Sequence, residues 1–494
     1  MNTSEESISD DISPATATPS ARHLLRELTE TLTLAVPMAL TQLGQIAMMT
    51  TDLALVGRLG AEAIAAAALA STVYFVSFTV GLGVVSAVAP LAAQAYGAGN
   101  AHQVRRALRV GLWAAPLISL PMMAFPLYGE RILLALGQAR EPAHLAQQYL
   151  FGLVWGATPA LWLIAIRGFM GALNRPEPVL WITLAAIPAN ALLAYLLING
   201  LWGLPQLGLF GAGLAHTIVN CAMFLAGLWF ATSRRPFAKY HVLGRLWRID
   251  WAMMGQLLAI GAPISFAFLM EYGLFSAASL LAGLISTTAL AAHQIALQVA
   301  AILFMGPFGI GMAATIRVGH AAGRNDADGV RRAGFAAALL GLMLGIAVTA
   351  AVILGRFAIA RLFLGSTDGN VAATIALAAT LLLVGATFFI TDALQAVVAG
   401  ALRGLKDTRM PLLFAVIGYW VIGFPTAWAL AFYTDLGAVG VWIGLSIGTT
   451  VYAVLLILRF RSLSKRLALL RPGPHRPVDL AHASQGAGPP RRVH

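Results

Sequence analysis

Long apolar segments separated by short polar loops run along almost the whole chain. Each has about 20 or more mostly apolar residues, the length that an α-helix needs to cross the hydrocarbon core of a bilayer. The segments are continuous rather than alternating, which favours helices over the strands of a membrane barrel. We therefore expect an all-α integral membrane protein with twelve transmembrane helices, several long enough to tilt. The segments lie near residues 31–56, 65–93, 108–128, 148–173, 179–201, 207–232, 253–282, 288–316, 333–364, 372–402, 411–432 and 437–460.

The second half of the chain repeats the first, at an offset of 226 residues early on and of 229 later. At 226, the matches are Pro37 with Pro263, Gly57 with Gly283, Gly83 with Gly309, Gly97 with Gly323, and 104–106 with 330–332; at 229, they are 171–173 with 400–402, Leu207-Gly208 with Leu436-Gly437, and Gly211 with Gly440. Six helices per half is an even number, so both halves enter the membrane in the same direction, as in the parallel repeats of alternating-access transporters. An inert duplicated scaffold would leave the polar residues inside each half unexplained.

This repeat predicts the domain organisation. We expect a disordered tail at 1–25, an N-lobe of helices one to six at 26–235, and a polar, basic linker at 236–250. A C-lobe of helices seven to twelve follows at 251–465, and a second disordered tail at 466–494.

The charge pattern sets the expected orientation. The chain is 59% hydrophobic and only 11% charged, and its net charge is +12. Lys and Arg gather in the loops after the even-numbered segments, which predicts cytoplasmic N- and C-termini in a bacterial-type inner membrane. The excess of positive charge therefore reflects topology and contact with membrane lipid rather than nucleic-acid binding. The N-terminal stretch lacks the basic start and apolar core of a signal peptide, and a single cysteine, Cys221, excludes an intramolecular disulfide.

Of the 20 acidic residues, three lie deep inside hydrophobic segments: Asp52, Glu271 and Asp392. Charges inside a bilayer are costly, by about 3 kcal/mol on insertion scales, and usually mark an ion or substrate path. No Lys lies in a hydrophobic segment, so we expect these carboxylates to lack a basic partner and to hold a proton readily. Their oxygens also suit Na⁺, at Glu271 and Asp392 above all. A structural carboxylate fixed by neighbouring hydroxyls is the alternative.

The repeat does not duplicate these three charges, because the equivalent positions are Ala278 for Asp52, Gln45 for Glu271 and Leu163 for Asp392. Several weaker candidates could line a substrate cavity: Gln42, Met270, Tyr272, His293 and Gln395. Each of them is also compatible with ordinary packing or an interhelical hydrogen bond. For His216, we expect a core histidine with satisfied hydrogen bonds.

Four long motifs are specific enough to compare with known families: VPMALTQLGQIAMMTTDLALVGRLGAEAIAAAALA, RGFMGALNRPEPVLWITLAAIPANALLAYLLINGLWGLPQLGLFGAGLA, ALAAHQIALQVAAILFMGPFGIGMAATIRVGHAAGR and DALQAVVAGALRGLKDTRMP. They resemble the multidrug and toxic compound extrusion (MATE) family, and its NorM-like branch in particular, and the resemblance spans about residues 30–460. It implies a two-lobe antiporter, without a cofactor, that expels cationic amphiphilic drugs in exchange for H⁺ or Na⁺.

The resemblance also implies roles for single residues. The N-lobe acid of the family falls on Asp52, its C-lobe cation-site acids fall on Glu271 and Asp392, and its first fifth-segment asparagine falls on Asn190. The second asparagine of many NorM-like members is Ala194 here. This departure removes an oxygen ligand from the N-lobe and favours H⁺ over Na⁺ as the coupling ion.

We therefore expect a monomeric secondary transporter that is not an enzyme. A lipid-linked oligosaccharide flippase of the wider superfamily is the nearest alternative, but it would need a cationic cavity. A membrane-embedded protease would need a GxGD or HExxH motif, and the chain has neither. A channel is a further alternative, although unequal acids in a duplicated fold suit a carrier better.

Overall fold

The computed structural model describes residues 21–203, 205–244, 247–364 and 369–469, and these residues form helices joined by short loops. The first half contains α1 (Ala21–Gly57), α2 (Ala61–Ser86), α3 (Val88–Gly97), α4 (Ala101–Leu127), α5 (Gly129–Ala135), α6 (Arg140–Val154), α7 (Ala157–Ala172), α8 (Glu177–Asn199) and α9 (Gly208–Ser233). A short 3-10 helix, η1 (Phe237–Tyr240), precedes the second half. That half contains α10 (Trp251–Ile285), α11 (Thr287–Gly323), α12 (Ala327–Leu364), α13 (Gly369–Val384), α14 (Ala386–Gly404), α15 (Arg409–Ala415), the π-helix η2 (Val416–Gly423), α16 (Phe424–Phe432) and α17 (Ala438–Leu469).

The all-helical membrane fold predicted from the sequence is confirmed. Among the described residues, 11 helical spans are long and apolar enough to cross a membrane, and the bent pair α6 and α7 brings the number to 12. The two helices of this pair meet at an angle of 45°. The tails expected at 1–25 and 466–494 lie almost entirely outside the described residues.

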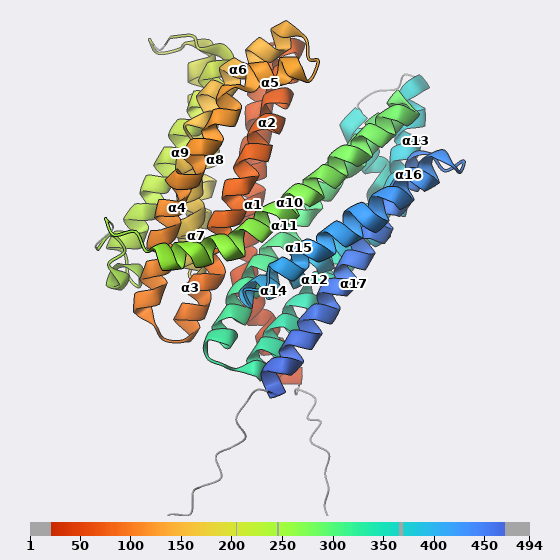
Figure 1. Cartoon of the computed structure of the whole chain (residues 1–494). Helices are drawn as coiled ribbons and strands as arrows, with labels where there is room; N and C mark the ends of the chain where they lie inside the picture. The colour runs from red at the N-terminus through yellow and green to blue at the C-terminus, as the bar shows by residue number, and fades with distance from the viewer. Residues whose placement is uncertain (1–20, 204, 245–246, 365–368, 470–494) are drawn as a thin grey trace, which may run out of the picture.

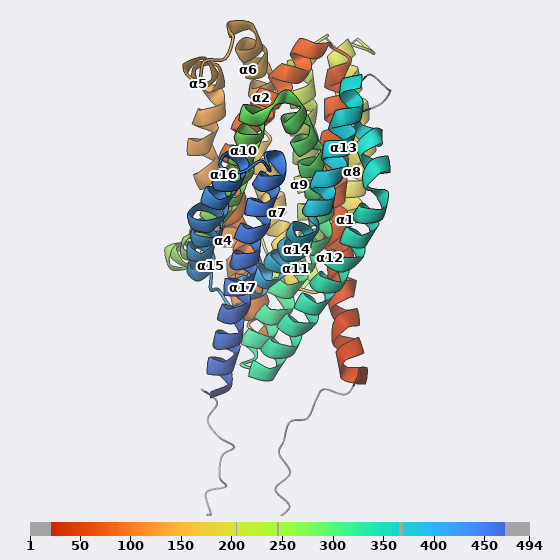
Figure 2. The ribbon, with the colours of Figure 1, turned by 90° about the vertical axis from the view of Figure 1, so that its right-hand side faces the viewer.

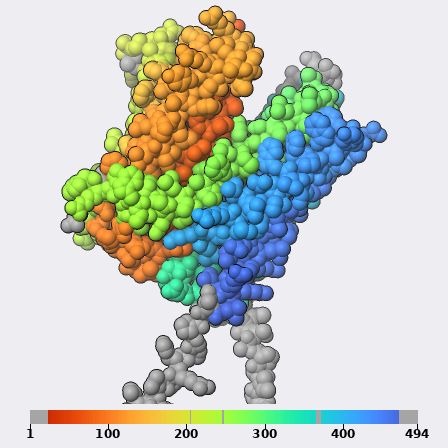
Figure 3. Space-filling view, viewed as in Figure 1, coloured from red at the N-terminus to blue at the C-terminus, as the bar shows by residue number. Residues whose placement is uncertain are grey.

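The two halves form two arms that meet at one end and diverge at the other (Figure 1). The start of α1 and the end of α17 lie together at the end where the arms meet, and a turn of the molecule by 90° shows the same arrangement (Figure 2). The space-filling view shows a hollow between the arms at the opposite end (Figure 3). The molecule is therefore open toward one side only.

The buried core follows the same division. One hydrophobic cluster joins residues of both halves, among them Val84 and Leu91 with Ile264 and Ile310. Two clusters belong to the first half alone and one to the second half alone. The shared cluster includes α3 and α7, the first parts of α4, α10 and α12, the last part of α11, and single turns of α1, α2 and α14. The arms are thus held together at the end where their shared core lies.

Glycines from the sequence repeat make the closest contacts between the halves. A Cβ on Gly97 would lie 2.2 Å from the His320 carbonyl oxygen, and one on Gly323 would lie 2.1 Å from the Gln94 carbonyl oxygen. Gly97 and Gly323 occupy equivalent positions in the repeat, and so do Gln94 and His320. The two contacts are therefore equivalent and related by the two-fold symmetry of the repeat. Helices approach this closely only where the side chain is absent. The structure is consistent with the two-fold repeat predicted from the sequence.

Ion pairs reinforce this junction. Arg317 of α11 reaches across to α1, where its Nη2 lies 2.6 Å from Glu27 and 2.7 Å from Glu30. Arg106 of α4 pairs with Asp250, the residue that caps the N-terminus of α10. Burial alone would raise the pKa of Asp250, but hydrogen bonds from the Met253 amide and Arg106 hold it below its ordinary value. The junction therefore combines apolar packing with charge pairs.

Two glycines of α10 offer a matched test of this packing. A Cβ on Gly261 would lie 2.5 Å from Val84 Cα in the other half, whereas one on Gly255 would meet nothing within 4 Å. We predict that Gly261→Ala destabilises the purified protein by about 1–3 kcal/mol through overpacking. Gly255→Ala should leave the melting temperature unchanged or raise it, because Ala favours a helix. Equal melting temperatures for the two variants would contradict a close contact between the halves.

Candidate functional site

Two of the three acids that the sequence places inside apolar segments meet in the second half of the chain. Asp392 lies on α14 and is 6% exposed, and Glu271 lies on α10 and is only partly buried. Gln395, one helical turn after Asp392, joins them: its Nε2 donates to Asp392 Oδ1 at 3.0 Å and to Glu271 Oε1 at 3.2 Å. One amide group thus supplies a hydrogen to each carboxylate. A half-turn of the amide would present its oxygen to the same site instead.

The surroundings of this carboxylate pair are less apolar than the sequence suggested. Arg403, in the last turn of α14, lines the same small cavity as Glu271, and its charge acts on that carboxylate. The expectation that Glu271 lacks a basic partner was therefore wrong. The sequence analysis ended segment ten at residue 402 and so placed Arg403 in the following loop. In the structure α14 continues to Gly404, so Arg403 is still helical and its side chain reaches the cavity beside Glu271. Tyr452 of α17 completes the wall of this cavity.

The cavity next to Glu271 measures about 20 Å³, and a second one that Asp392 lines measures about 10 Å³. A water molecule or a small ion needs roughly 10–15 Å³ by this measure, whereas drug-sized ligands need several hundred. In this conformation, the carboxylate pair has room for an ion or water but not for a drug.

A π-helix brings a tyrosine close to the same pair. Tyr419 lies within η2, is 1% exposed, and its hydroxyl has no hydrogen-bond partner among the described residues. Both Glu271 and Asp392 act on it electrostatically. Single π-helical turns are rare and frequently occur at functional sites. A buried hydroxyl without a partner is costly, so Tyr419 is available to donate to a carboxylate or to a bound group.

The third acid has a separate site in the first half. Asp52 of α1 is 4% exposed, and each of its oxygens has a partner from another helix. Asn190 Nδ2 of α8 donates to Oδ1, and His216 Nδ1 of α9 lies 3.2 Å from Oδ2. Asn190 Oδ1 is buried and has no hydrogen-bond partner among the described residues. Sequence reasoning expected Asn190 near Asp52 but treated His216 as an ordinary core residue.

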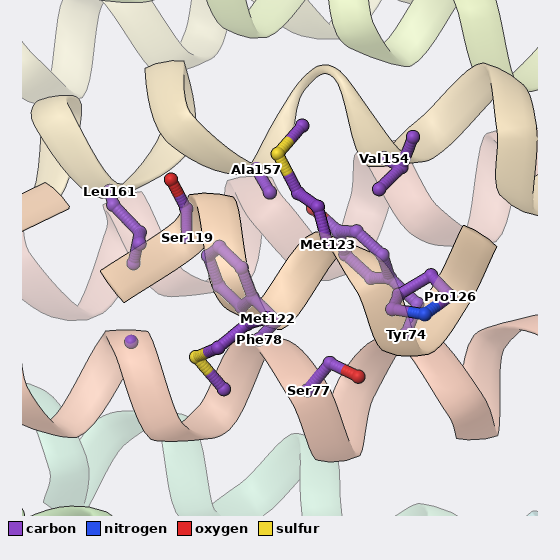
Figure 4. Close-up of a pocket in the computed structure, with 11 residues that line it drawn as sticks. Tyr74, Ser77, Phe78, Ser119, Met122, Met123, Pro126, Val154, Ala157 and Leu161 are labelled. Carbon is purple, nitrogen blue, oxygen red and sulfur yellow. The ribbon is translucent and has the colours of Figure 1, made fainter. Parts of the chain in front are cut away.

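A separate small cavity of about 20 Å³ lies in the first half, between α2, α4, α6 and α7. Figure 4 shows Tyr74 and Phe78 of α2 facing Met123 of α4, with side chains of the bent α6–α7 pair on the far side. Tyr149 of α6 lies close enough to both Asp52 and Tyr74 to interact with them electrostatically.

The weaker cavity candidates take different positions. Gln42 accepts a hydrogen bond from Arg167 of α7, a buried arginine that the sequence reasoning did not single out. Tyr272 packs on Phe75 of the other half, with ring centroids 4.7 Å apart. The Met270 carbonyl accepts from Trp420 at 3.1 Å.

His293 is fully buried, and both of its ring nitrogens are engaged. Its Nε2 lies 3.1 Å from Ser279 Oγ, and its Nδ1 accepts from Trp442 at 3.2 Å. This hydrogen bonding fixes a neutral ring in the core of the second half, away from the cavities next to Glu271 and Asp392.

Comparisons with known proteins agree with this architecture. The sequence model of the family described as MatE matches residues 37–196 and 263–429, one segment in each half. A probable multidrug resistance protein NorM from Bradyrhizobium diazoefficiens is 68% identical over 445 residues, covering 90% of this chain and 95% of that protein. A second probable multidrug resistance protein NorM, from Rhodopseudomonas palustris, is 60% identical over 439 residues, covering 89% of this chain and 92% of that protein.

The chain belongs to the MATE family.

Solved structures of MATE transporters share the fold. The eukaryotic MATE transporter AtDTX14 superposes with a TM-score of 0.80 at 23% identity, covering 90% of this chain and 98% of its own. A MATE protein in complex with MaL6 gives a TM-score of 0.81 at 20% identity, covering 92% and 100%. As a MATE protein, this chain is a multi-pass multidrug transporter and not an enzyme.

The shared amide of Gln395 gives a testable consequence for this MATE transporter. Gln395→Leu would leave two buried carboxylates without their common donor, and an unsatisfied buried polar group costs about 1–3 kcal/mol. We predict a lower melting temperature of the purified protein at neutral pH. Gln298→Leu is the matched control, because Gln298 is an exposed residue on α11. Equal melting temperatures for the two variants would show that the amide does not hold the carboxylates.

Proposed function

We propose that this MATE protein exports cationic amphiphilic compounds in exchange for a coupling cation. In this proposal, Glu271 and Asp392 bind the coupling cation and the cationic compound in alternation. The observation that carries this proposal is the pair of carboxylates on one amide, one buried and one partly buried, beside a cavity of about 20 Å³. Such a site can take a proton or a small ion. Its negative charge also attracts a cationic compound that reaches the hollow between the arms.

In this scheme, the compound occupies the space between the arms, where Met270 and Tyr272 flank Glu271 along α10. Tyr272 and Phe75 meet there from opposite halves, and we propose that Gln42 and Gln395 offer polar groups to the compound. A proton or ion that neutralises the carboxylates weakens their attraction for the cationic compound, so the two are bound in alternation. The chain works as a monomer in a bacterial-type inner membrane, with both termini cytoplasmic, in line with its basic loops.

We further propose H⁺ as the coupling ion, with Asp52 as a second protonation site. Asp52 has an imidazole and an amide as its partners. Ala194, which stands where many NorM-like members have a second asparagine, offers no side-chain oxygen to Na⁺. Groups of three or more His, Cys, Asp or Glu that could hold a metal ion do not occur among the described residues. A carboxylate hydrogen-bonded to a histidine suits proton exchange, since both groups can carry the proton.

Na⁺ is the second candidate for the C-half pair. Oxygens of Glu271, Asp392 and a rotated Gln395 amide would form a set of hard ligands, which suits such a cation. The lipid-linked oligosaccharide flippase is less well supported. Arg403 lies beside Glu271, which shares the Gln395 amide with a second carboxylate, so the local charge does not favour a pyrophosphate.

Substitution of the C-half carboxylates tests the exchange site. Glu271→Gln or Asp392→Asn should reduce ethidium export to the level of membranes without the protein, because the amide cannot take up and release a proton. Membrane expression should stay near that of the wild type. Glu62→Gln is the control, since Glu62 is an exposed acid in the first turn of α2. Wild-type export by either site variant, at equal expression, would make the carboxylate a structural group.

The coupling ion is tested in everted membrane vesicles. We predict that a pH gradient alone, acid inside, drives ethidium uptake and that Asp52→Asn abolishes this response. His216→Gln should give an intermediate rate, because the carboxylate keeps its amide partner but loses the imidazole. His144→Gln is the matched control, as His144 is a largely exposed histidine on α6. Uptake that follows a Na⁺ gradient and ignores a collapsed pH gradient would assign the coupling to Glu271 and Asp392 instead.

A further inference from the structure

A large groove in the second half lies away from the carboxylates. It has a volume of about 520 Å³ and runs between α12, α14 and α17, near the end where the two arms meet. The three helices lie side by side there (Figure 2). The groove is about 25 times as large as the cavity beside Glu271, on the two volumes of about 520 and 20 Å³. Nothing in the transport scheme uses it.

The groove is apolar along its length and basic at one end. Residues one and two helical turns apart on α14, such as Leu394, Val398 and Ala401, form its floor, and Phe460 of α17 lies within it. Three cationic side chains line its mouth: Arg331 from the first turns of α12, and Arg461 and Lys465 from one face of α17. Among the residues that the structure describes, no acidic side chain lines the groove.

The cationic side chains are exposed and only weakly engaged. The side chain of Arg331 is 72% exposed, and its contact with Asp328 is 3.9 Å long, at the limit of an ion pair. Arg461 and Lys465 are four residues apart and exposed. Exposed pairs of this kind contribute little to stability. The three charges are therefore available to an anionic group at the mouth of the groove.

The repeat shows that this groove is a special feature of the second half. The first-half counterparts of its small residues are bulky: Leu108 stands for Gly334, Leu112 for Ala338, and Phe169 for Val398. Leu108 and Phe169 are fully buried and fill the corresponding space. In place of Arg461 and Lys465, the first half has Thr232 and Pro236. The duplicated copy thus lacks the small residues and two of the three cationic side chains, and it keeps only Arg105, the counterpart of Arg331.

We propose that this groove, between α12, α14 and α17, binds an anionic diacyl phospholipid. The phosphate would lie against Arg331, Arg461 and Lys465, and an acyl chain would run along Leu394 and Val398. Two independent features match this ligand. Clustered Lys and Arg at the edge of the hydrocarbon region attract anionic headgroups, and an apolar groove beside them accepts a chain that is continuous with the headgroup. A free phosphate would use the first feature only, and a zwitterionic lipid the second only.

The proposal is tested with the purified full-length chain by native mass spectrometry in detergent. The probes are dioleoyl phosphatidylglycerol, dioleoyl phosphatidylcholine and glycerol 3-phosphate at equal concentrations. We expect the wild type to retain phosphatidylglycerol over phosphatidylcholine by on the order of tenfold, and to retain no glycerol 3-phosphate. Equal retention of the two lipids, or retention of glycerol 3-phosphate, would overturn the proposal.

Two variants separate the charge from the groove. Arg461→Gln with Lys465→Gln should remove most of the preference for phosphatidylglycerol. Its control, Arg234→Gln with Lys239→Gln, removes the same charge near η1, where each side chain lies over an aromatic ring, and should keep the preference. If the control also loses the preference for phosphatidylglycerol, the preference depends on the overall charge of the protein and not on the groove, and the proposal is wrong.

The second variant, Ala338→Leu with Leu339→Trp, copies the first-half residues Leu112 and Trp113 into the groove without changing the charge. It should lose retention of phosphatidylglycerol while its melting temperature without lipid stays near that of the wild type. Full retention in this variant would show that the groove is not occupied. If this filled variant does not fold, the charge variant and its control still decide the proposal.

Discussion

The structure depends on the close contact between its two halves at one end of the molecule. Backbone meets backbone at Gly97 and Gly323, with no room for a Cβ on either. Contacts this close are stiff, because a packed interface does not deform continuously. The arms can therefore diverge at the other end while their bases remain joined. The hollow between them and the one-sided opening both follow from where the glycines of the repeat lie (Figure 3).

The low dielectric constant inside the membrane protein makes its interior polar groups depend strongly on their hydrogen-bond partners. A charge inside a membrane protein is stable only with partners, and here the partners are few and shared. Gln395 serves two carboxylates at once, and Asp52 depends on one amide and one imidazole. If one proton or ion is added, the hydrogen-bond pattern of the whole group must change. That sensitivity is what a coupling site needs, and a fully satisfied residue such as His293 lacks it.

Much of this arrangement could be predicted from the sequence, because helices in a membrane follow from apolar length and the two halves follow from the repeat. The three interior acids were also visible, since so few charges lie inside apolar segments. Contacts that depend on helix rotation were not. His216 lies 164 residues from Asp52 along the chain, and no pattern showed that α9 turns it toward α1. Arg403 was misplaced for a simpler reason: α14 extends past its apolar segment and carries this arginine into the helical bundle.

The repeat explains the framework, and the departures from it explain the chemistry. Both halves contribute the same glycine contacts, but the first half has an acid with an imidazole and the second has two acids with an amide. The groove between α12, α14 and α17 is likewise confined to the second half. A duplicated scaffold needs equal residues only where the halves touch. Away from that contact each half can diverge, so the positions at which the copies differ most in charge and size are those where a function specific to one half is to be sought.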